Sequence, residues 1–193
     1  MNSGLLAPAF SLAPVWDQKG KAIYSLIDDA NGLFEPSGIW ATVPLSPRWV
    51  QPILVVATRR KSADIYFCPG HLWLFSKDAR QILSWTEDKS AEFLPVTIAA
   101  IGTYYLLHAL AAVTLAPSAT VQRNEISGNI LIEEAAFESK DVGATPIFYA
   151  AQPRDSAAGR AGLCNPPVFL NSRAAADLRG AAVSGAALVA TKA

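Results

Sequence analysis

The sequence predicts a strand-rich α+β fold with two short strand–helix–strand units in its carboxy-terminal part. In each unit a short apolar run ends on a serine, a short helical pattern follows and a second apolar run closes the unit. This succession is typical of two strands joined by a helix. The segments cover 72–76, 78–83 and 92–96 in the first unit, and 167–172, 174–178 and 184–189 in the second.

The amino-terminal part, residues 1–65, is predicted to be irregular and rich in aromatic residues and proline, ahead of an α+β domain over 66–193. Prolines disfavour regular structure over 1–20 and keep 41–52 extended or turning. Short apolar runs nevertheless predict strands at 21–27, 53–57 and 65–67.

Local signals set the limits of the first unit. Ser76 is expected to start the helix, because its hydroxyl can accept a hydrogen bond from a first-turn N–H. Asp78 in that first turn complements the helix dipole. Pro95 lies in the strand that follows the helix, and it predicts an edge position or a bulge because proline cannot donate to a ladder.

The rest of the chain is predicted to be mostly strand. Residues 104–113 contain leucine and alanine, which favour helix, but also tyrosine and valine, which favour strand. Their length and the breaks at Gly102 and Pro117 favour a strand. Ser172 is expected to cap the second helix and Gly180 to end it. Further strands are predicted at 129–133, 147–149 and 186–190, and a loop of small residues at 151–164.

Composition excludes several classes of protein. The 193 residues suffice for one domain or two small ones, and 51% hydrophobic with 17% charged residues argues against disorder. Sixteen basic residues balance sixteen acidic ones, so the basic excess of a nucleic-acid-binding protein is missing. The longest apolar run, 104–116, is shorter than the roughly 20 residues of a membrane span. With no signal-peptide pattern at the start, a soluble cytoplasmic protein is expected.

Four residues could in principle build a reactive site, and these are Cys68, His71, His108 and Cys164. Zinc sites usually pair two close ligands with two more close ligands, but the second pair here is widely separated. A cysteine nucleophile needs a nearby cation or a helix N-terminus, which the Pro-Gly turn after Cys68 does not supply. We therefore expect no metal, no cofactor and no catalytic residue. His108 lies in the most apolar segment and is expected to be a hydrogen-bonded core residue.

Two groups of residues are candidates for contact with a partner. Trp40 and Trp49 fall in the proline-rich part, where aromatic residues serve as a local core or as interface anchors. Glu133, Glu134 and Glu138 form an acidic group that could meet a basic partner. Adjacent acids on a strand point to opposite faces, so Glu133 and Glu134 are poor candidates for a catalytic pair.

From about 72 to 192 the chain resembles a family of bacterial immunity proteins from polymorphic toxin systems, long described only as a domain of unknown function. The blocks Phe93-Leu94-Pro95-Val96 and Tyr104-Tyr105-Leu106-Leu107 carry most of the resemblance. The other matching segments are 74–83, Ile147-Phe148 and the closing 172–185 stretch.

The resemblance implies that the protein binds one cognate toxin or secretion-system effector and neutralises it in the producing bacterial cell. It implies no enzyme activity, because the family has no agreed catalytic residues. The tryptophan loops or the acidic group would then dock on the toxin. A ligand-sensing or regulatory module with a pocket between the two units is the alternative, and a homodimer is compatible with the neutral net charge.

Overall fold

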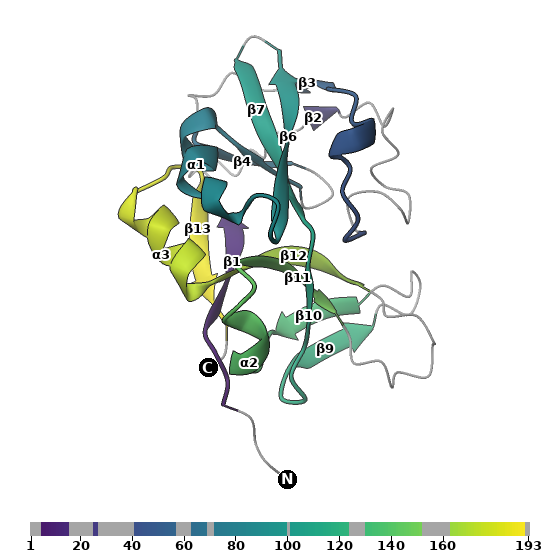
Figure 1. Cartoon of the computed structure of the whole chain (residues 1–193), viewed down its shortest axis with the longest axis vertical. Coiled ribbons are helices and arrows are strands. Elements are labelled where there is room, and N and C mark those ends of the chain that lie inside the picture. The colour runs from purple at the N-terminus through teal and green to yellow at the C-terminus, as the bar shows by residue number, and fades with distance from the viewer. Residues whose placement is uncertain are drawn as a thin grey trace.

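The computed structural model describes residues 5–15, 25–26, 41–56, 63–68, 72–99, 101–123, 130–151 and 163–191. These residues form two mixed β-sheets, a two-stranded ribbon and a few short helices (Figure 1). The expected strand-rich α+β class is confirmed. Among the described residues, no helix has the length and apolar character needed to cross a membrane.

Six strands form the sheet in the upper half of Figure 1. They are β2 (Ser25–Leu26), β3 (Ile53–Val56), β4 (Ile65–Cys68), β5 (Leu72–Phe75), β6 (Ala91–Ile98) and β7 (Gly102–Ala109). Their order is β2-β3-β6-β7-β5-β4, and only β3 and β6 are parallel neighbours. The strand interpretation of 104–113 is confirmed for residues 104–109, so helix, the alternative, is wrong there.

Five strands form the second sheet, in the lower half of Figure 1. They are β1 (Ala9–Pro14), β8 (Ala112–Thr114), β11 (Ile147–Ala151), β12 (Leu163–Asn171) and β13 (Ala186–Ala190), in the order β13-β1-β12-β11-β8. The expectation of an irregular stretch over 1–20 is wrong for residues 9–14, which pair with strands more than 150 positions away. The loop expected at 151–164 is also wrong at its ends, because β11 includes Ala151 and β12 begins at Leu163.

A ribbon of β9 (Thr120–Arg123) and β10 (Ile130–Glu134) lies beside β12. Its register shifts between Ile132, which faces Val121, and Glu134, which faces Thr120. Glu133 is therefore the extra residue of a β-bulge. The short helix α2 (Ser139–Val142) follows the ribbon.

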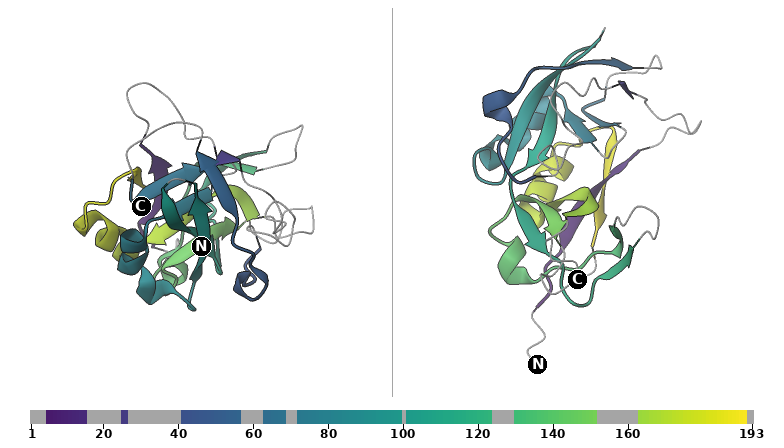
Figure 2. Two further views of the ribbon diagram at one scale, coloured as in Figure 1. Left: turned by 90° about the horizontal axis from the view of Figure 1, so that it is seen from above. Right: turned by 90° about the vertical axis from the view of Figure 1, so that its right-hand side faces the viewer.

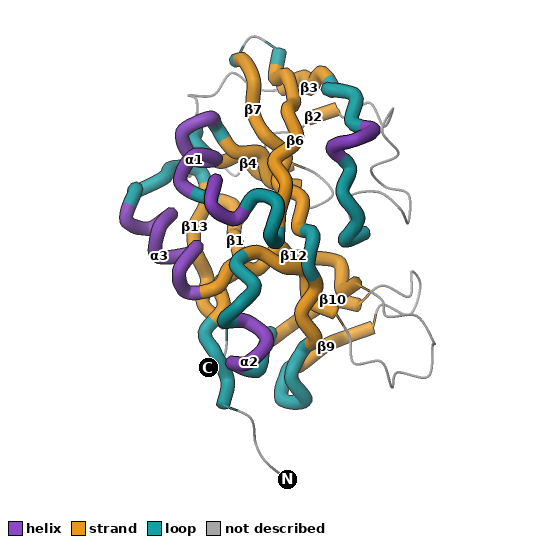
Figure 3. Tube along the Cα trace, in the orientation of Figure 1, coloured by secondary structure: helices purple, strands orange, loops and turns teal. Residues whose placement is uncertain are grey.

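Helices α1 (Lys77–Ile82) and α3 (Ser172–Gly180) lie together on one side of the molecule, as the tube in Figure 3 shows. Ser76 caps α1 as expected, and its hydroxyl accepts from the Ala79 N–H at 3.1 Å. The expected cap of α3 is wrong by one residue. Asn171 caps the helix through Oδ1, while the Ser172 hydroxyl donates to the Pro8 carbonyl. An asparagine at the end of β12 is an equally favoured cap, so the helix begins one residue earlier.

The expectation for Pro95 needs a correction. β6 lies between β3 and β7, and its register with β7 continues from Ala91 to Ile98 without a bulge. However, β3 pairs with β6 only at Thr97 and Ile98. Pro95 therefore stands where β6 has a single ladder partner, so its missing N–H leaves no gap in the sheet.

Three apolar clusters hold the layers together (Figure 2 gives two further views). The largest is built from both sheets and both longer helices, with Trp73, Phe75, Tyr149 and Leu178 among its buried residues. A second lies on the other face of the six-stranded sheet, under Leu45 and Trp49. The third contains three phenylalanine rings within 6 Å of one another, those of Phe137, Phe148 and Phe169. The upper and lower sheets thus share the largest of the three clusters.

Candidate functional site

A buried ion pair connects the two central strands of the six-stranded sheet, β6 and β7. Glu92 on β6 and His108 on β7 are directly opposite in the antiparallel ladder. Their side chains meet with Nδ1 and Oε1 2.7 Å apart, and His108 is fully buried while Glu92 is 9% exposed. The prediction that His108 is a hydrogen-bonded core residue is confirmed.

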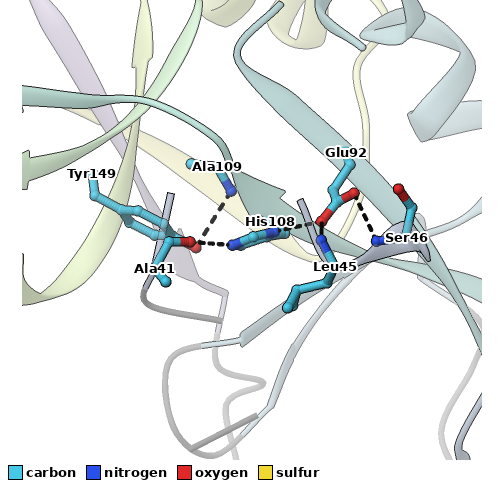
Figure 4. Close-up of polar contacts among 7 residues, drawn as sticks. All are labelled: Ala41, Leu45, Ser46, Glu92, His108, Ala109 and Tyr149. Atoms are coloured by element: carbon cyan, nitrogen blue, oxygen red, sulfur yellow. Dashed lines mark hydrogen bonds and ion pairs between the residues drawn. The ribbon is translucent and has the colours of Figure 1, made fainter. Parts of the chain in front are cut away.

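This pair clamps a segment over the sheet, residues 41–49, which we call the strap (Figure 4). The Leu45 and Ser46 N–H groups donate to the Glu92 carboxylate at 2.6 and 3.1 Å. His108 Nε2 lies 2.7 Å from the Ala41 carbonyl oxygen. Both ring nitrogens of His108 thus lie within hydrogen-bond distance of protein oxygens. The strap is held by charge-assisted hydrogen bonds.

The carboxyl of Glu92 is kept ionised by these contacts. Burial raises its pKa, but hydrogen bonds from Leu45, His108 and Ser46 outweigh burial and bring the pKa below the ordinary value. Tyr149 lies beside the pair, and its hydroxyl accepts from the Ala109 N–H at 3.4 Å. Burial raises the pKa of the Tyr149 phenol, so this hydroxyl stays neutral.

The arrangement suits clamping rather than catalysis. Both ring nitrogens of His108 are engaged by protein oxygens, so neither is left to contact a substrate. Cys68 is buried in the apolar cluster under the strap, away from the polar contacts of His108. His71 and the side chain of Cys164 lie outside the described residues. In the part of the chain that is described, no three His, Cys, Asp or Glu residues gather as metal ligands.

Trp49 anchors the far end of the strap. Its indole N–H donates to the Pro95 carbonyl at 2.8 Å, and the ring packs against the apolar cluster below it. Between the strap and β6 lies a groove of about 430 Å³, which Trp49, Glu92 and Asp88 help to line. Trp49 is therefore a packed residue that presents part of its surface to a groove. Trp40 lies outside the described residues.

Glu133 and Glu134 line a second groove, which we call the acidic groove. It has a volume of about 450 Å³ and lies between β10 and the strands β1 and β13. Adjacent residues of a regular strand point to opposite faces, but the bulge at Glu133 lets both side chains line the same groove, so the expectation of opposite faces is wrong here. Its full lining comprises Ser11, Ile132, Glu133, Glu134, Ala135, Phe169, Val189, Ala190 and Thr191.

Glu138 and Trp49 stand apart from this groove. Glu138 precedes α2 and forms an ion pair with Lys140 at 2.8 Å. Trp49 packs against the cluster on the six-stranded sheet. Sequence reasoning missed Glu92 and Val189. Glu92 lies in no recognisable motif. Its position opposite His108 becomes visible only when the register of β6 and β7 is known.

No protein-family model matches the sequence, and no curated protein matches it.

Acid is expected to loosen the strap. The folded-state pKa of Glu92 is lower than its unfolded value, ordinarily 4.5. The stabilisation is therefore complete above that value and is lost as the pH falls through the folded-state pKa. Urea unfolding of wild type and Glu92→Gln should show a free-energy difference that shrinks on acidification. Asp64, whose pKa is lowered by Ser184, titrates in the same direction, so Asp64→Asn serves as the parallel reference. A difference independent of pH would contradict an ionised Glu92.

Proposed function

We propose that this protein is an immunity protein that binds a cognate bacterial toxin and neutralises it by protein–protein contact in the cytoplasm. The proposal assigns it no catalysis and no cofactor. The observation that carries the proposal is the acidic groove, where two exposed carboxylates lie beside exposed apolar side chains. Its support from the sequence is the family resemblance.

The chemistry of this surface favours a basic partner with apolar anchors. None of the described residues that line the acidic groove is Lys or Arg. Val189 in its lining is 49% exposed, and Val121, which faces Ile132 in the ribbon, is 40% exposed. Complementary charge accelerates association, and buried apolar anchors supply most of the affinity of an interface. A toxin whose surface carries basic residues together with apolar side chains would supply both the complementary charge and the apolar anchors.

We further propose that β5–α1–β6 and β12–α3–β13 are two copies of one motif. In each, the helix joins two strands that flank a third strand antiparallel to both, β7 in the first and β1 in the second. Two copies of this motif would form a rigid scaffold whose helices take no part in chemistry, and such a scaffold suits a binding protein.

Charge reversal at the groove is expected to weaken toxin binding. A tagged protein would first be used to capture the partner from native lysate, with identification by mass spectrometry. Calorimetry with that partner should then show at least about tenfold weaker binding for Glu133→Lys/Glu134→Lys, because like charges would oppose each other. Glu138→Lys is the matched control, since Glu138 does not line the groove. Unchanged affinity of the double variant would remove the acidic groove from the interface.

One observation favours the sensing alternative. A pocket of about 250 Å³ lies between β4 of one sheet and α3, β1 and β13 of the other, with Leu12, Ile65 and Leu178 in its wall. We call it the apolar pocket. Arg179 is its charged member, and the guanidinium lies over the Phe10 ring. A small apolar molecule that stays bound in native mass spectrometry, with no protein partner captured, would favour this alternative.

A further inference from the structure

The apolar pocket runs along one face of β1 and β13. Leu12 and Leu188 are partners in the ladder between these strands, and both line the pocket together with Ala186. Leu178 on α3 forms one wall, and Ile65 on β4 forms another. Figure 1 shows α3 beside the two strands. The pocket therefore lies where a helix meets strands of both sheets.

Buried aliphatic side chains give the pocket an apolar interior. Ile65 is 1% exposed and Leu178 is fully buried, while Val183, Ala186 and Leu188 are half-buried. An apolar cavity of about 150 Å³ is large enough to hold benzene. The volume of about 250 Å³ found here can therefore take an aliphatic chain of several carbons.

The charged group of the pocket lies toward one end of β13. The guanidinium carbon of Arg179 is 5.2 Å from the centre of the Phe10 ring. Phe10 pairs with Ala190, two residues along β13 from Leu188. Ile65 lies near the start of the strand instead, because its N–H donates to the residue before Gly185. A ligand lying along the pocket would thus have Arg179 at one end and aliphatic side chains at the other.

The charge of Arg179 is available to a ligand. The ion pairs among the described residues involve Arg80, His108 and Lys140, and none involves Arg179. Its side chain is exposed and stacks on an aromatic ring. Such stacking steadies a guanidinium, whose planar N–H groups match the two oxygens of a carboxylate. An arginine at the rim of an apolar pocket therefore favours a ligand with a carboxylate head and an aliphatic tail.

We propose that the apolar pocket binds a medium-chain fatty acid, with the carboxylate on Arg179 and the chain directed along β13 toward Ile65. The reverse orientation is unfavourable because Asp64, which accepts from Ser184, would place a negative charge beside the carboxylate. This inference goes beyond the proposed function. The apolar pocket and the acidic groove share no lining residue, so the two sites can be tested separately.

Calorimetry of the full chain with sodium octanoate should show one saturable site. Hexanoate and butanoate should bind about fourfold more weakly for each methylene removed, because burial of each methylene removes apolar surface from water. Octylamine carries the same chain with the opposite charge and should bind at least about tenfold more weakly than octanoate. Equal affinity for octanoate and octylamine, or no dependence on chain length, would overturn the proposal.

Arg179→Ala tests the position of the carboxylate. The variant should bind octanoate at least about tenfold more weakly, because the charge-assisted hydrogen bonds to the ligand are lost. Arg173→Ala is the matched control, since Arg173 also lies on α3 and over an aromatic ring, that of Trp85, but does not line the pocket. Octanoate affinity that is unchanged in Arg179→Ala, or lowered equally in both variants, would contradict the assignment.

Ala186→Leu tests the position of the chain. The larger side chain would occupy part of the pocket and should weaken octanoate binding at least about tenfold. Ala187→Leu is the control, because neighbouring residues of a strand point to opposite faces and Ala187 does not line the pocket. Methyl NMR of the wild-type protein gives the same information without a substitution. Octanoate should shift the methyl signals of Ile65, Leu178 and Leu188, and shifts confined to other residues would overturn the proposal.

The acidic groove provides a check that the two sites are independent. Glu133→Lys/Glu134→Lys should bind octanoate as wild type does, because neither residue lines the apolar pocket. Capture of a protein partner without any octanoate binding would remove the fatty-acid site and leave the proposed function standing. Octanoate binding without a captured partner would support the fatty-acid site and count against the proposed function.

Discussion

Replacing Glu92 by alanine is expected to lower the free energy of unfolding by about 3–5 kcal/mol, the usual cost of breaking a buried ion pair. The change leaves Nδ1 of the buried His108 ring without its carboxylate partner. It also leaves the Leu45 and Ser46 N–H groups without their acceptor. Urea unfolding followed by tryptophan fluorescence gives the free energy.

A surface ion pair provides the reference for this prediction. Arg80 and Glu87 form a bidentate pair whose side chains are 34% and 25% exposed. Glu87→Ala should cost no more than about 1 kcal/mol, because water and salt screen such pairs. Equal costs for Glu92→Ala and Glu87→Ala would show that the buried pair does not hold the strap.

A double-variant cycle tests whether the two buried residues act together. Glu92→Gln and His108→Gln should each destabilise the protein, and the double variant should cost less than the sum, because each single variant already breaks the same contact. Strict additivity would mean that the contact at 2.7 Å contributes little to stability.

Features encoded within a few residues were predictable from the sequence. Ser76 caps α1 because an N-cap depends only on the residues that follow it. The strand at 186–190 was found with its observed bounds, since turn-forming residues precede an apolar run. Even the error at α3 is local, because Asn171 and Ser172 are adjacent residues with similar capping chemistry.

Features that depend on pairing between distant strands were not predictable. The segment 9–14 follows Pro8, ends on Pro14 and resembles a loop, yet its place between β12 and β13 makes it a strand. The contact of Glu92 with His108 follows from the register of β6 and β7, which one sequence does not reveal. The same holds for the bulge at Glu133, which requires β9 opposite β10.

Alanine in place of Gly185 is expected to lower the free energy of unfolding by about 2–6 kcal/mol, the sum of backbone strain and steric overlap. Gly185 has φ +93°, and an added Cβ would lie 2.0 Å from the Ile65 carbonyl oxygen. That oxygen cannot withdraw easily, because the Ile65 N–H donates to the Ser184 carbonyl at 3.0 Å. Asp64 adds to the junction by accepting from both the N–H and the hydroxyl of Ser184.

Two other glycines separate the two contributions to that cost. Gly102 has φ +128° with nothing within 4 Å of an added Cβ, so Gly102→Ala should show backbone strain alone, about 1–3 kcal/mol. Gly180 has neither a positive φ nor a close neighbour, and Gly180→Ala should be neutral or slightly stabilising. Thermal and urea unfolding should therefore rank the three variants with Gly185→Ala the least stable. If Gly185→Ala costs no more than Gly102→Ala, then β4 and the start of β13 can separate without loss, and the contact between the two sheets at this point is not rigid.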